Sequence, residues 1–183
     1  LFRSTNWISP GEIQFVSVRL APLFEELLST LRESEESPER ATYELLLPPD
    51  LPAVRGQPDQ LRQAFLNVLQ NARQALPPEG GRIRIEADRL TARASAPVRV
   101  RVADTGRGIA PADAEKAFEP FFTRREKGVG LGLAITRRII EAHGGQITLR
   151  PADPPPGAIV EILLQADESN SPESGDPAPD GSH

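Results

Sequence analysis

Four short blocks of residues, in a fixed order along the chain, constrain its fold more than any other feature of the sequence. They occupy residues 67–71, 104–108, 118–123 and 128–133. Their order differs from the dinucleotide-binding pattern and from the P-loop. Each block alone is a weak signal. Together they predict a single nucleotide site with metal ligands, a carboxylate that reads the base, a mobile lid and a phosphate-binding loop.

The composition of the chain narrows its class. A length of 183 residues predicts one domain, and a net charge of -5 without a basic stretch argues against a nucleic-acid partner. The sequence has no cysteine, no visible signal peptide and no apolar run near the roughly 20 residues of a membrane span. It begins at Leu1 and has no methionine, so we expect a piece of a longer protein. We expect this domain to be cytoplasmic and without direct membrane contact, even where its parent protein is membrane-anchored.

Hydrophobic periodicity predicts an α+β fold. Helical spacing occurs at 22–34, 60–76 and 131–142, and a shorter helix is expected at 112–118. Strand patterns occur at 43–47, 54–55, 82–88, 98–103, 147–149 and 159–164. We therefore expect a two-layer α/β sandwich, in which about three helices pack on one face of a mixed, mostly antiparallel sheet.

The ends of the chain differ in composition from its middle. Residues 1–19 lack a clear period and are expected to be a linker or the end of a preceding segment, whereas 20–165 form the domain. From residue 166 onward the chain is rich in Asp, Glu, Ser, Pro and Gly, which predicts a disordered acidic tail over 166–183. Within the domain, Asp59 is expected to cap the second long helix.

The first block predicts a metal site. Asn67 and Asn71 are four residues apart, so on a helix they stand one turn above each other on the same face. An asparagine carbonyl oxygen is a neutral, hard ligand that suits Mg²⁺, and it leaves the charge of the metal to offset phosphate. The alternative is a pair of surface asparagines on an amphipathic helix, which the other three blocks disfavour.

The second block predicts recognition of adenine. Asp104 is expected at the end of a strand, where its carboxylate can accept a hydrogen bond from the exocyclic amine of adenine. Guanine presents a carbonyl oxygen at that place, and a buried polar group left unpaired costs about 1–3 kcal/mol. Gly106 and Gly108 are expected to adopt positive φ and to let the backbone approach the base. The alternative is an ordinary Asp-x-Gly turn.

The last two blocks predict a lid and a phosphate loop. Three of the seven phenylalanines lie within 118–122, either as a small satellite of the core or as a lid that docks over nucleotide. Arg124 and Arg125 follow, and an arginine there can stabilise charge during phosphoryl transfer. The glycine-rich loop 128–132 lets backbone N–H groups face phosphate oxygens where a helix begins.

In this order, the four blocks resemble the ATP-binding domain of sensor histidine kinases, within the wider family that includes DNA gyrase, mismatch-repair ATPases and heat-shock chaperones. The resemblance covers roughly residues 20–165 and is greatest to the nitrogen-regulator group of these kinases. It implies ATP and Mg²⁺ as cofactors, with Asn71 and Asn67 as the metal ligands. It also implies that ATP is bound by Asn67, Asn71, Asp104, Gly106, Gly108, Ile109, Phe122, Thr123, Gly128, Gly130, Leu131, Gly132 and Leu133.

Position 67 bears on which reaction such a domain catalyses. In the hydrolysing relatives, a glutamate four residues before the metal-binding asparagine activates water. Here that place holds Asn67, which cannot accept a proton at neutral pH. The resemblance therefore implies a protein-histidine kinase rather than an ATPase. Arg125 matches the lysine of the family's more usual Thr-Thr-Lys, but Arg124 competes for the same role, and we expect one of them to be catalytic together with Asn67.

The kinase family transfers phosphate to a histidine on a separate dimerisation domain. This chain has two histidines, of which His183 is its last residue, and His143 is expected to cap or pack at a helix end. The resemblance implies two partners, the histidine-containing dimerisation domain of the same parent protein and a response regulator. We expect the isolated chain to be unable to autophosphorylate. The alternatives are a serine kinase of the anti-sigma type, an ATPase, and a degenerate nucleotide sensor.

Overall fold

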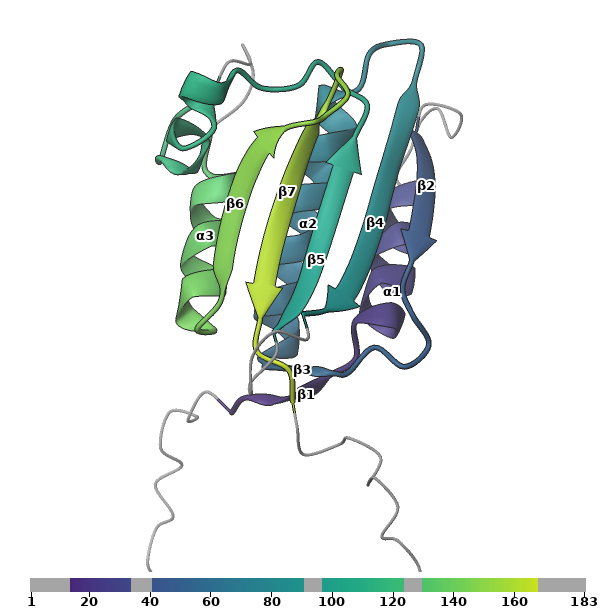
Figure 1. Ribbon diagram of the computed structural model, residues 1–183, viewed down its shortest axis with the longest axis vertical. Coiled ribbons are helices and arrows are strands. Elements are labelled where there is room, and N and C mark those ends of the chain that lie inside the picture. Colours follow the sequence, from purple (N-terminus) through teal and green to yellow (C-terminus); the bar gives the residue numbers. More distant parts are fainter. Residues whose placement is uncertain (1–13, 34–40, 91–96, 124–129, 168–183) are drawn as a thin grey trace, which may run out of the picture.

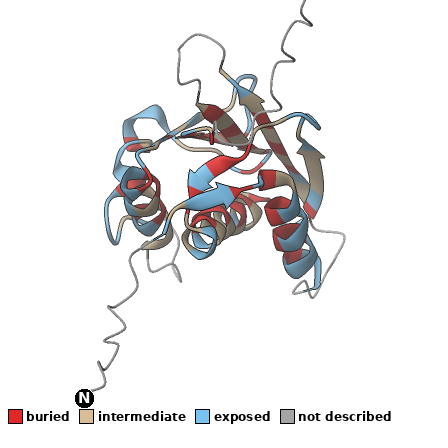
Figure 2. Cartoon of the chain, turned by 90° about the horizontal axis from the view of Figure 1, so that it is seen from below, coloured by how far each residue is buried: buried red, intermediate tan, exposed pale blue. Residues whose placement is uncertain are grey.

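The computed structural model describes residues 14–33, 41–90, 97–123 and 130–167. These residues form two layers, a five-stranded sheet and three α-helices that cover one of its faces (Figure 1). Seen from below, the described helices lie on a single side of the sheet (Figure 2). The expected α+β class is confirmed. Among the described residues, no helix is both long enough and apolar enough to span a membrane.

Apart from β1 and the two 3-10 turns, the elements follow the order expected from the sequence. The α-helices are α1 (Leu20–Glu33), α2 (Pro58–Ala75) and α3 (Gly132–Ala142). The strands are β1 (Val16–Val18), β2 (Ala41–Leu46), β3 (Val54–Gly56), β4 (Gly81–Arg89), β5 (Val98–Asp104), β6 (Gln146–Pro151) and β7 (Ala158–Leu164). Two 3-10 turns, η2 (Pro111–Asp113) and η3 (Lys116–Phe118), lie between β5 and α3.

The main sheet has the strand order β2-β4-β5-β7-β6. The pair β2 and β4 is parallel, and the other three pairs are antiparallel. β5 is central, and its side chains alternate between buried and half-buried because one face packs against the helices. Its last residue, Asp104, stands opposite Ile83 of β4 and Ala158 of β7. A carboxylate therefore stands at the end of the central strand of the sheet.

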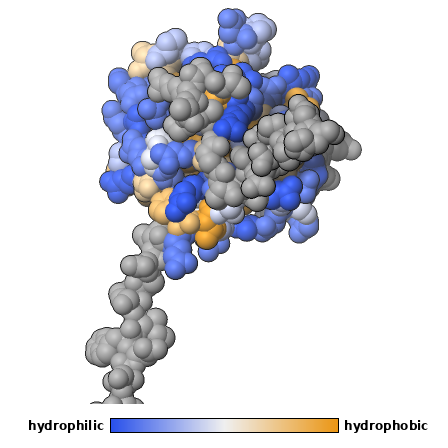
Figure 3. Space-filling model, turned by 60° about the horizontal axis from the view of Figure 1, so that its bottom comes forward, coloured by the Kyte–Doolittle hydropathy of each residue, from blue (hydrophilic) through white to orange (hydrophobic). Residues whose placement is uncertain are grey.

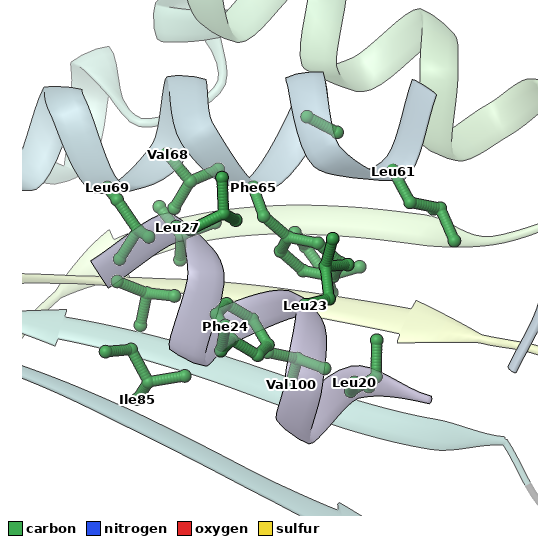
Figure 4. Close-up of a cluster of buried hydrophobic side chains, with 14 of the residues drawn as sticks. Leu20, Leu23, Phe24, Leu27, Leu61, Phe65, Val68, Leu69, Ile85 and Val100 are labelled. Atoms are coloured by element: carbon green, nitrogen blue, oxygen red, sulfur yellow. The ribbon is translucent and has the colours of Figure 1, made fainter. Parts of the chain in front are cut away.

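The core lies between this sheet and helices α1 and α2. Figure 4 shows apolar side chains of the two helices meeting above Ile85 and Val100 of the sheet. Phe24 of α1 and Phe65 of α2 are fully buried, with ring centroids 4.7 Å apart. Burial of a side chain of this size stabilises the fold by about 1.5–3 kcal/mol. The apolar stripe of α2 fixes its rotation, so its polar face is turned away from α1.

The face of the sheet opposite the helices is covered by charged pairs. Arg84 pairs with Glu44 at 2.8 Å, and the Arg99 guanidinium donates to Asp88 at 2.7 Å and 3.0 Å. This hydrogen bond, which Asp88 accepts, raises the pKa of Arg99 above its usual value. Pairs at a partly exposed surface each contribute only about 0–1 kcal/mol. They make this face of the sheet polar.

A second, two-stranded sheet closes the base of the domain. β1 pairs with β3, and Val54 of β3 also forms an isolated bridge with Ala166. The Asp167 N–H donates to the Ala53 carbonyl at 2.8 Å. The structure thus places a strand within the segment expected to be a linker, and orders two residues of the expected tail. Main-chain pairing holds both, and such pairing leaves no signal in composition. Figure 3 shows this end as mostly hydrophilic, with a small apolar group.

The predicted cap of α2 is wrong. The N-cap is Gln57, whose side chain makes no capping hydrogen bond, and Pro58 occupies the first turn. Proline is favoured there because its fixed φ suits a helix and its missing N–H has no helical partner in any case. Asp59 lies inside the first turn, where its negative charge is favourable next to the positive end of the helix dipole.

The prediction of one short helix at 112–118 is also wrong, because the segment forms two separate 3-10 turns, η2 and η3. The second turn stops at Glu119, whose backbone is extended with ψ of 138°. Pro120 follows, and a proline disfavours the helical conformation in the residue before it. The segment is therefore held by the burial of Ala117 and Phe118 rather than by a continuous helix.

Candidate functional site

Helices α2 and α3 bring the first and fourth sequence blocks together. The side-chain amide of Asn67 donates to the Gly132 carbonyl at 3.3 Å. A Cβ atom added to Gly132 would lie 3.7 Å from Nδ2 of Asn71 and 4.0 Å from the side chain of Asn67. The two asparagines therefore face the first turn of α3, although more than 60 residues separate them along the chain.

Asp104 occupies the position expected for it, at the end of β5. The residue is only 9% exposed, and its Oδ1 accepts a hydrogen bond from the Gly106 N–H at 2.8 Å. This bond holds the side chain in one orientation across the following turn. A carboxylate fixed in this way can accept a further hydrogen bond without losing side-chain freedom on binding.

The glycines after Asp104 have different tasks. Gly108 has φ of 70°, and a Cβ atom there would lie 2.8 Å from the Gly157 carbonyl. Gly106 lacks the positive φ expected for it. It is needed for another reason, since a Cβ atom on Gly106 would lie 2.4 Å from the carbonyl oxygen of Ala75. Gly106 therefore lets the turn pack against the end of α2, and it does not line the cavity described next.

A cavity of about 1120 Å³ opens between α2, the start of α3, the turn after β5 and the β6–β7 loop. This volume is slightly above the range of about 300–1,000 Å³ for small-molecule sites, so it is sufficient for a nucleotide. Most of the predicted binding residues line it. They are Asn67, Asn71, Asp104, Gly108, Ile109, Phe122, Thr123, Gly130, Leu131, Gly132 and Leu133. Gly128, Arg124 and Arg125 lie outside the residues that the structure describes.

The cavity also has walls that the sequence did not assign to it. Apolar side chains from three neighbouring strands, Val102, Leu149 and Val160, line it. Prolines of the β6–β7 loop and the polar residues Gln70, Gln74, Arg107 and Asp113 also line it. The alternation of Val102 and Val160 in their strands was visible in the sequence. Only the sheet order, which places β5, β7 and β6 side by side, shows that they share one surface.

The three aromatic residues of the third block are divided among three environments. Phe118 is 4% exposed, and the guanidinium carbon of Arg137 lies 4.7 Å from its ring centroid. Phe121 is 72% exposed and has φ of 68°, which is uncommon outside glycine. Phe122 lines the cavity. The interpretation of 118–122 as one lid is therefore too simple, because Phe118 belongs to the core.

The phosphate loop region meets the third block directly. The Phe121 N–H donates to the Gly130 carbonyl at 2.9 Å. Gly130 has φ of 70°, and a Cβ atom there would lie 2.7 Å from the backbone of both Phe121 and Phe122. Only glycine fits this approach. Phe121 and Phe122, before 124–129, are thus held against Gly130, after it, and both Phe122 and Gly130 line the cavity.

The groups around the start of α3 fit a magnesium-bound triphosphate. Leu131 is the N-cap of this helix, and its side chain makes no capping hydrogen bond. The first turn of a helix has backbone N–H groups without helical partners and a partial positive charge, which favour anions. Asn67 and Asn71 add neutral amide oxygens, the type of ligand that suits Mg²⁺ beside phosphate.

Residues 56–168 match the family described as histidine kinase-, DNA gyrase B-, and HSP90-like ATPase, and the chain belongs to this family. It is 43% identical over 105 residues to the sensory histidine kinase/phosphatase NtrB of Escherichia coli O157:H7. That match covers 54% of this chain and 30% of NtrB. The chain therefore spans less than a third of the length of this relative.

Solved structures of sensor kinases have the same fold. The catalytic domain of histidine kinase ThkA matches with a TM-score of 0.71 at 29% identity, over 84% of this chain and 99% of that one. Full-length ShkA in complex with AMPPNP matches with a TM-score of 0.70 at 28% identity, over 86% of this chain and 32% of that one. The resemblance stated from the four blocks is thus confirmed at the level of family and fold.

Proposed function

We propose that this domain binds Mg²⁺-ATP in the cavity and donates the γ-phosphate to a histidine on a dimerisation domain of the same parent protein. The observation that supports this most strongly is the meeting of Asn67 and Asn71 with Gly132 beside a cavity that also reaches Asp104. The names of NtrB and ThkA as histidine kinases support the reaction, and the AMPPNP complex of ShkA supports an adenine nucleotide as ligand.

Each part of the site has a separate task in this proposal. Asp104 accepts a hydrogen bond from the exocyclic amine of adenine, while Val102 and Val160 pack against the base. Backbone N–H groups at the start of α3 donate to phosphate oxygens. Asn67 and Asn71 would hold Mg²⁺, which supplies charge neutralisation of the triphosphate when bound. Catalysis then rests on positioning and electrostatic stabilisation, as is general for phosphoryl transfer.

The same arrangement favours transfer over hydrolysis. Asn67 stands where hydrolysing relatives have a glutamate, and an amide cannot take a proton from water at neutral pH. A kinase must retain ATP until its acceptor arrives. Within the proposal, Arg125 or Arg124 stabilises the charge on the transferred phosphoryl group, because an arginine can bind phosphate through two parallel hydrogen bonds.

The acceptor must lie on another domain. His143 is buried at a helix end, and the only other histidine, His183, is the last residue of the chain. The expected cap at His143 is confirmed, because this residue forms the C-cap of α3. In the proposal, the phosphorylated dimerisation domain passes its phosphoryl group to a response regulator. The reaction takes place in the cytoplasm, where ATP is available, for either a soluble or a membrane-anchored parent.

Calorimetric titration with ATP, with and without Mg²⁺, tests the proposal when phosphate release is followed in the same samples. Saturable binding without steady release, followed by transfer to an added dimerisation domain, is the expected result. Steady release without an acceptor would instead indicate an ATPase, and acid-stable label on an added protein would indicate a serine kinase. Absence of binding, even with the dimerisation domain present, would overturn the proposal.

A further inference from the structure

His143 joins the two helices of the nucleotide site at the ends farthest from that site. It is the C-cap of α3 and is 5% exposed. Its Nδ1 lies 2.7 Å from the Ile139 carbonyl oxygen, within the last turn of α3. Its Nε2 accepts a hydrogen bond at 3.0 Å from the backbone N–H of Gln57, the N-cap of α2. One imidazole thus ties the end of α3 to the beginning of α2.

The two partners of the ring define its chemical form. A carbonyl oxygen can only accept a hydrogen bond, so Nδ1 must carry a proton to bond with Ile139. A backbone N–H can only donate, so Nε2 must have its lone pair available for Gln57. Only the neutral ring with its proton on Nδ1 makes both bonds. The position therefore requires a side chain that donates and accepts at once, which neither a lysine nor an arginine at this helix end can do.

This link is the last of three polar contacts that run along the pair of antiparallel helices. The contacts are Asn67 to the Gly132 carbonyl at 3.3 Å, Thr136 to the Ala64 carbonyl at 3.5 Å, and the Gln57 N–H to His143 at 3.0 Å. The second is the weakest, because the one hydroxyl proton of Thr136 also has the closer Gly132 carbonyl of its own helix at 2.9 Å. They are three and seven residues apart along α2, and four and seven residues apart along α3, from the nucleotide site to the base of the domain. Together they specify how far α3 is shifted along α2.

We propose that His143 is a positioning residue for the nucleotide site, because it fixes the register of α3 along α2. A shift by one residue would move Gly132 by about 1.5 Å relative to Asn67 and Asn71. A displacement of about 1 Å in a binding or catalytic group can lower activity by roughly a hundredfold. The inference rests on the proposed function, since it assumes that ATP binds between Gly132 and the two asparagines.

The ring is also held from the base of the domain. A Cβ atom added to Gly56 of β3 would lie 2.6 Å from Cδ1 of Leu61 on α2 and 2.9 Å from Cδ2 of His143, so it would press on both sides of the contact between the ring and α2. The ring of Phe15, just before β1, meets the imidazole edge to face with centroids 4.9 Å apart. The imidazole therefore cannot leave its position without moving the small base sheet, and a change at Gly56 gives a second way to disturb the ring.

The first test is His143→Phe, which keeps a planar ring against Phe15 and removes both hydrogen bonds. We expect this variant to bind Mg²⁺-ATP at least tenfold more weakly, measured by calorimetry at a temperature where the protein is fully folded. Leu28→Ala is the matched control, because Leu28 is buried on α1 and lies outside the α2–α3 pair. Equal ATP affinities in the two variants, at an equal loss of melting temperature, would overturn the proposal.

The second test needs no nucleotide, so it separates this inference from the proposed function. The side-chain amide signals of Asn67 and Asn71 should shift in the NMR spectrum of ATP-free His143→Phe, whereas they should stay in place in Leu28→Ala. Gly56→Ala retains the histidine and should shift the same signals in part, which keeps the test usable where His143→Phe fails to fold. Unmoved asparagine signals in Gly56→Ala, or ring nitrogen signals that place the proton on Nε2, would contradict the inference. If wild-type protein fails to bind ATP, the proposed function fails while this second test still decides on register.

Discussion

The carbonyl oxygen of Asp104 fills the space in which a side chain of residue 157 would stand. A Cβ atom added to Gly157 would lie 1.9 Å from that oxygen, and Gly157 has φ of 126°. Both facts require glycine, because an L side chain would clash and would strain the backbone. The β6–β7 loop and the end of β5 are thus in backbone contact at the residue that we propose reads adenine.

Gly157→Ala should therefore weaken ATP binding by roughly tenfold or more, since relief of the clash must move either Asp104 or the loop that lines the cavity. The measurement is ATP affinity by calorimetry. Gly144→Ala is a suitable control, because Gly144 also has positive φ (67°) but its added Cβ would meet only the side chain of Gln165. Gly144→Ala should lose about 1–3 kcal/mol from backbone strain alone. Gly157→Ala should lose more, because the clash with the Asp104 carbonyl oxygen is added to the strain. A similar loss of ATP affinity in both would show that strain alone explains the effect.

Asp104→Ala should abolish nucleotide binding while the fold survives, but Asp104→Asn is the sharper variant. An asparagine retains an oxygen that can accept from the Gly106 N–H, and it gains an amide that can donate to the carbonyl oxygen of guanine. We expect the preference for ATP over GTP to fall by about 1–3 kcal/mol, or roughly 5- to 150-fold. Competition titrations with both nucleotides measure the ratio. An unchanged ratio would remove Asp104 from base recognition.

Arg137 fastens the turn η3 to α3. Its guanidinium donates to Glu115 at 2.6 Å and lies over the Phe118 ring, while its Nε is 3.5 Å from Glu141. A partly exposed cation–π contact contributes about 0.5–1 kcal/mol, and an exposed ion pair about 0–1 kcal/mol. Arg137→Ala should therefore destabilise the domain by only about 1 kcal/mol. It should clearly accelerate amide hydrogen exchange at Phe118 and Glu119.

Arg138→Ala is the control for this prediction, because Arg138 is exposed on the same helix. It should leave exchange at Phe118 unchanged. Should both variants speed exchange equally, the effect would come from helix charge rather than from the contact between Arg137 and Phe118.

Hydrophobic periodicity in the sequence was sufficient to predict the two layers of this fold. The apolar stripe of α2 and the alternation of apolar and polar residues in β4, β5 and β7 are clear patterns in the sequence. They are clear because one face of each element is buried. The blocks also pointed to Asp104 and to Asn67 with Asn71, because their chemistry is unusual at those spacings. Strand order and backbone contacts had no such signal. The apolar wall with Val102 and Val160 depends on which strands are neighbours, and that is a property of topology.

Other features of the structure could not be predicted from the sequence for a related reason. The pairing of β1 with β3 and of Val54 with Ala166 consists of main-chain hydrogen bonds, which any sequence can make. The sequence placed Gly106 at a turn, but its true constraint is the carbonyl oxygen of Ala75, more than 30 residues earlier. The role of His143 between two helices likewise requires knowledge of which helix ends meet.

Asn71 supplies the last prediction, which concerns the metal. In the proposed site its amide oxygen is a Mg²⁺ ligand, so it should strengthen ATP binding only when the metal is present. Asn71→Ala should therefore lower ATP affinity in Mg²⁺ and change it little in a chelator, so that the benefit of Mg²⁺ shrinks by roughly tenfold. Gln63→Ala is the matched control, since Gln63 is an exposed amide on the same helix and does not line the cavity.

The quantity to compare is the ratio of ATP affinity with Mg²⁺ to ATP affinity without it. Titrations of both variants and of the wild-type protein, each with and without Mg²⁺, give this ratio directly. The control should retain the full ratio, because loss of a surface amide changes neither the helix nor the cavity. An equal loss of affinity in Asn71→Ala with and without the metal would mean that Asn71 shapes the cavity wall instead. Mg²⁺ would then be held by Asn67 and the phosphates alone, and the link from the Asn67 amide to Gly132 would become the critical contact for the metal site.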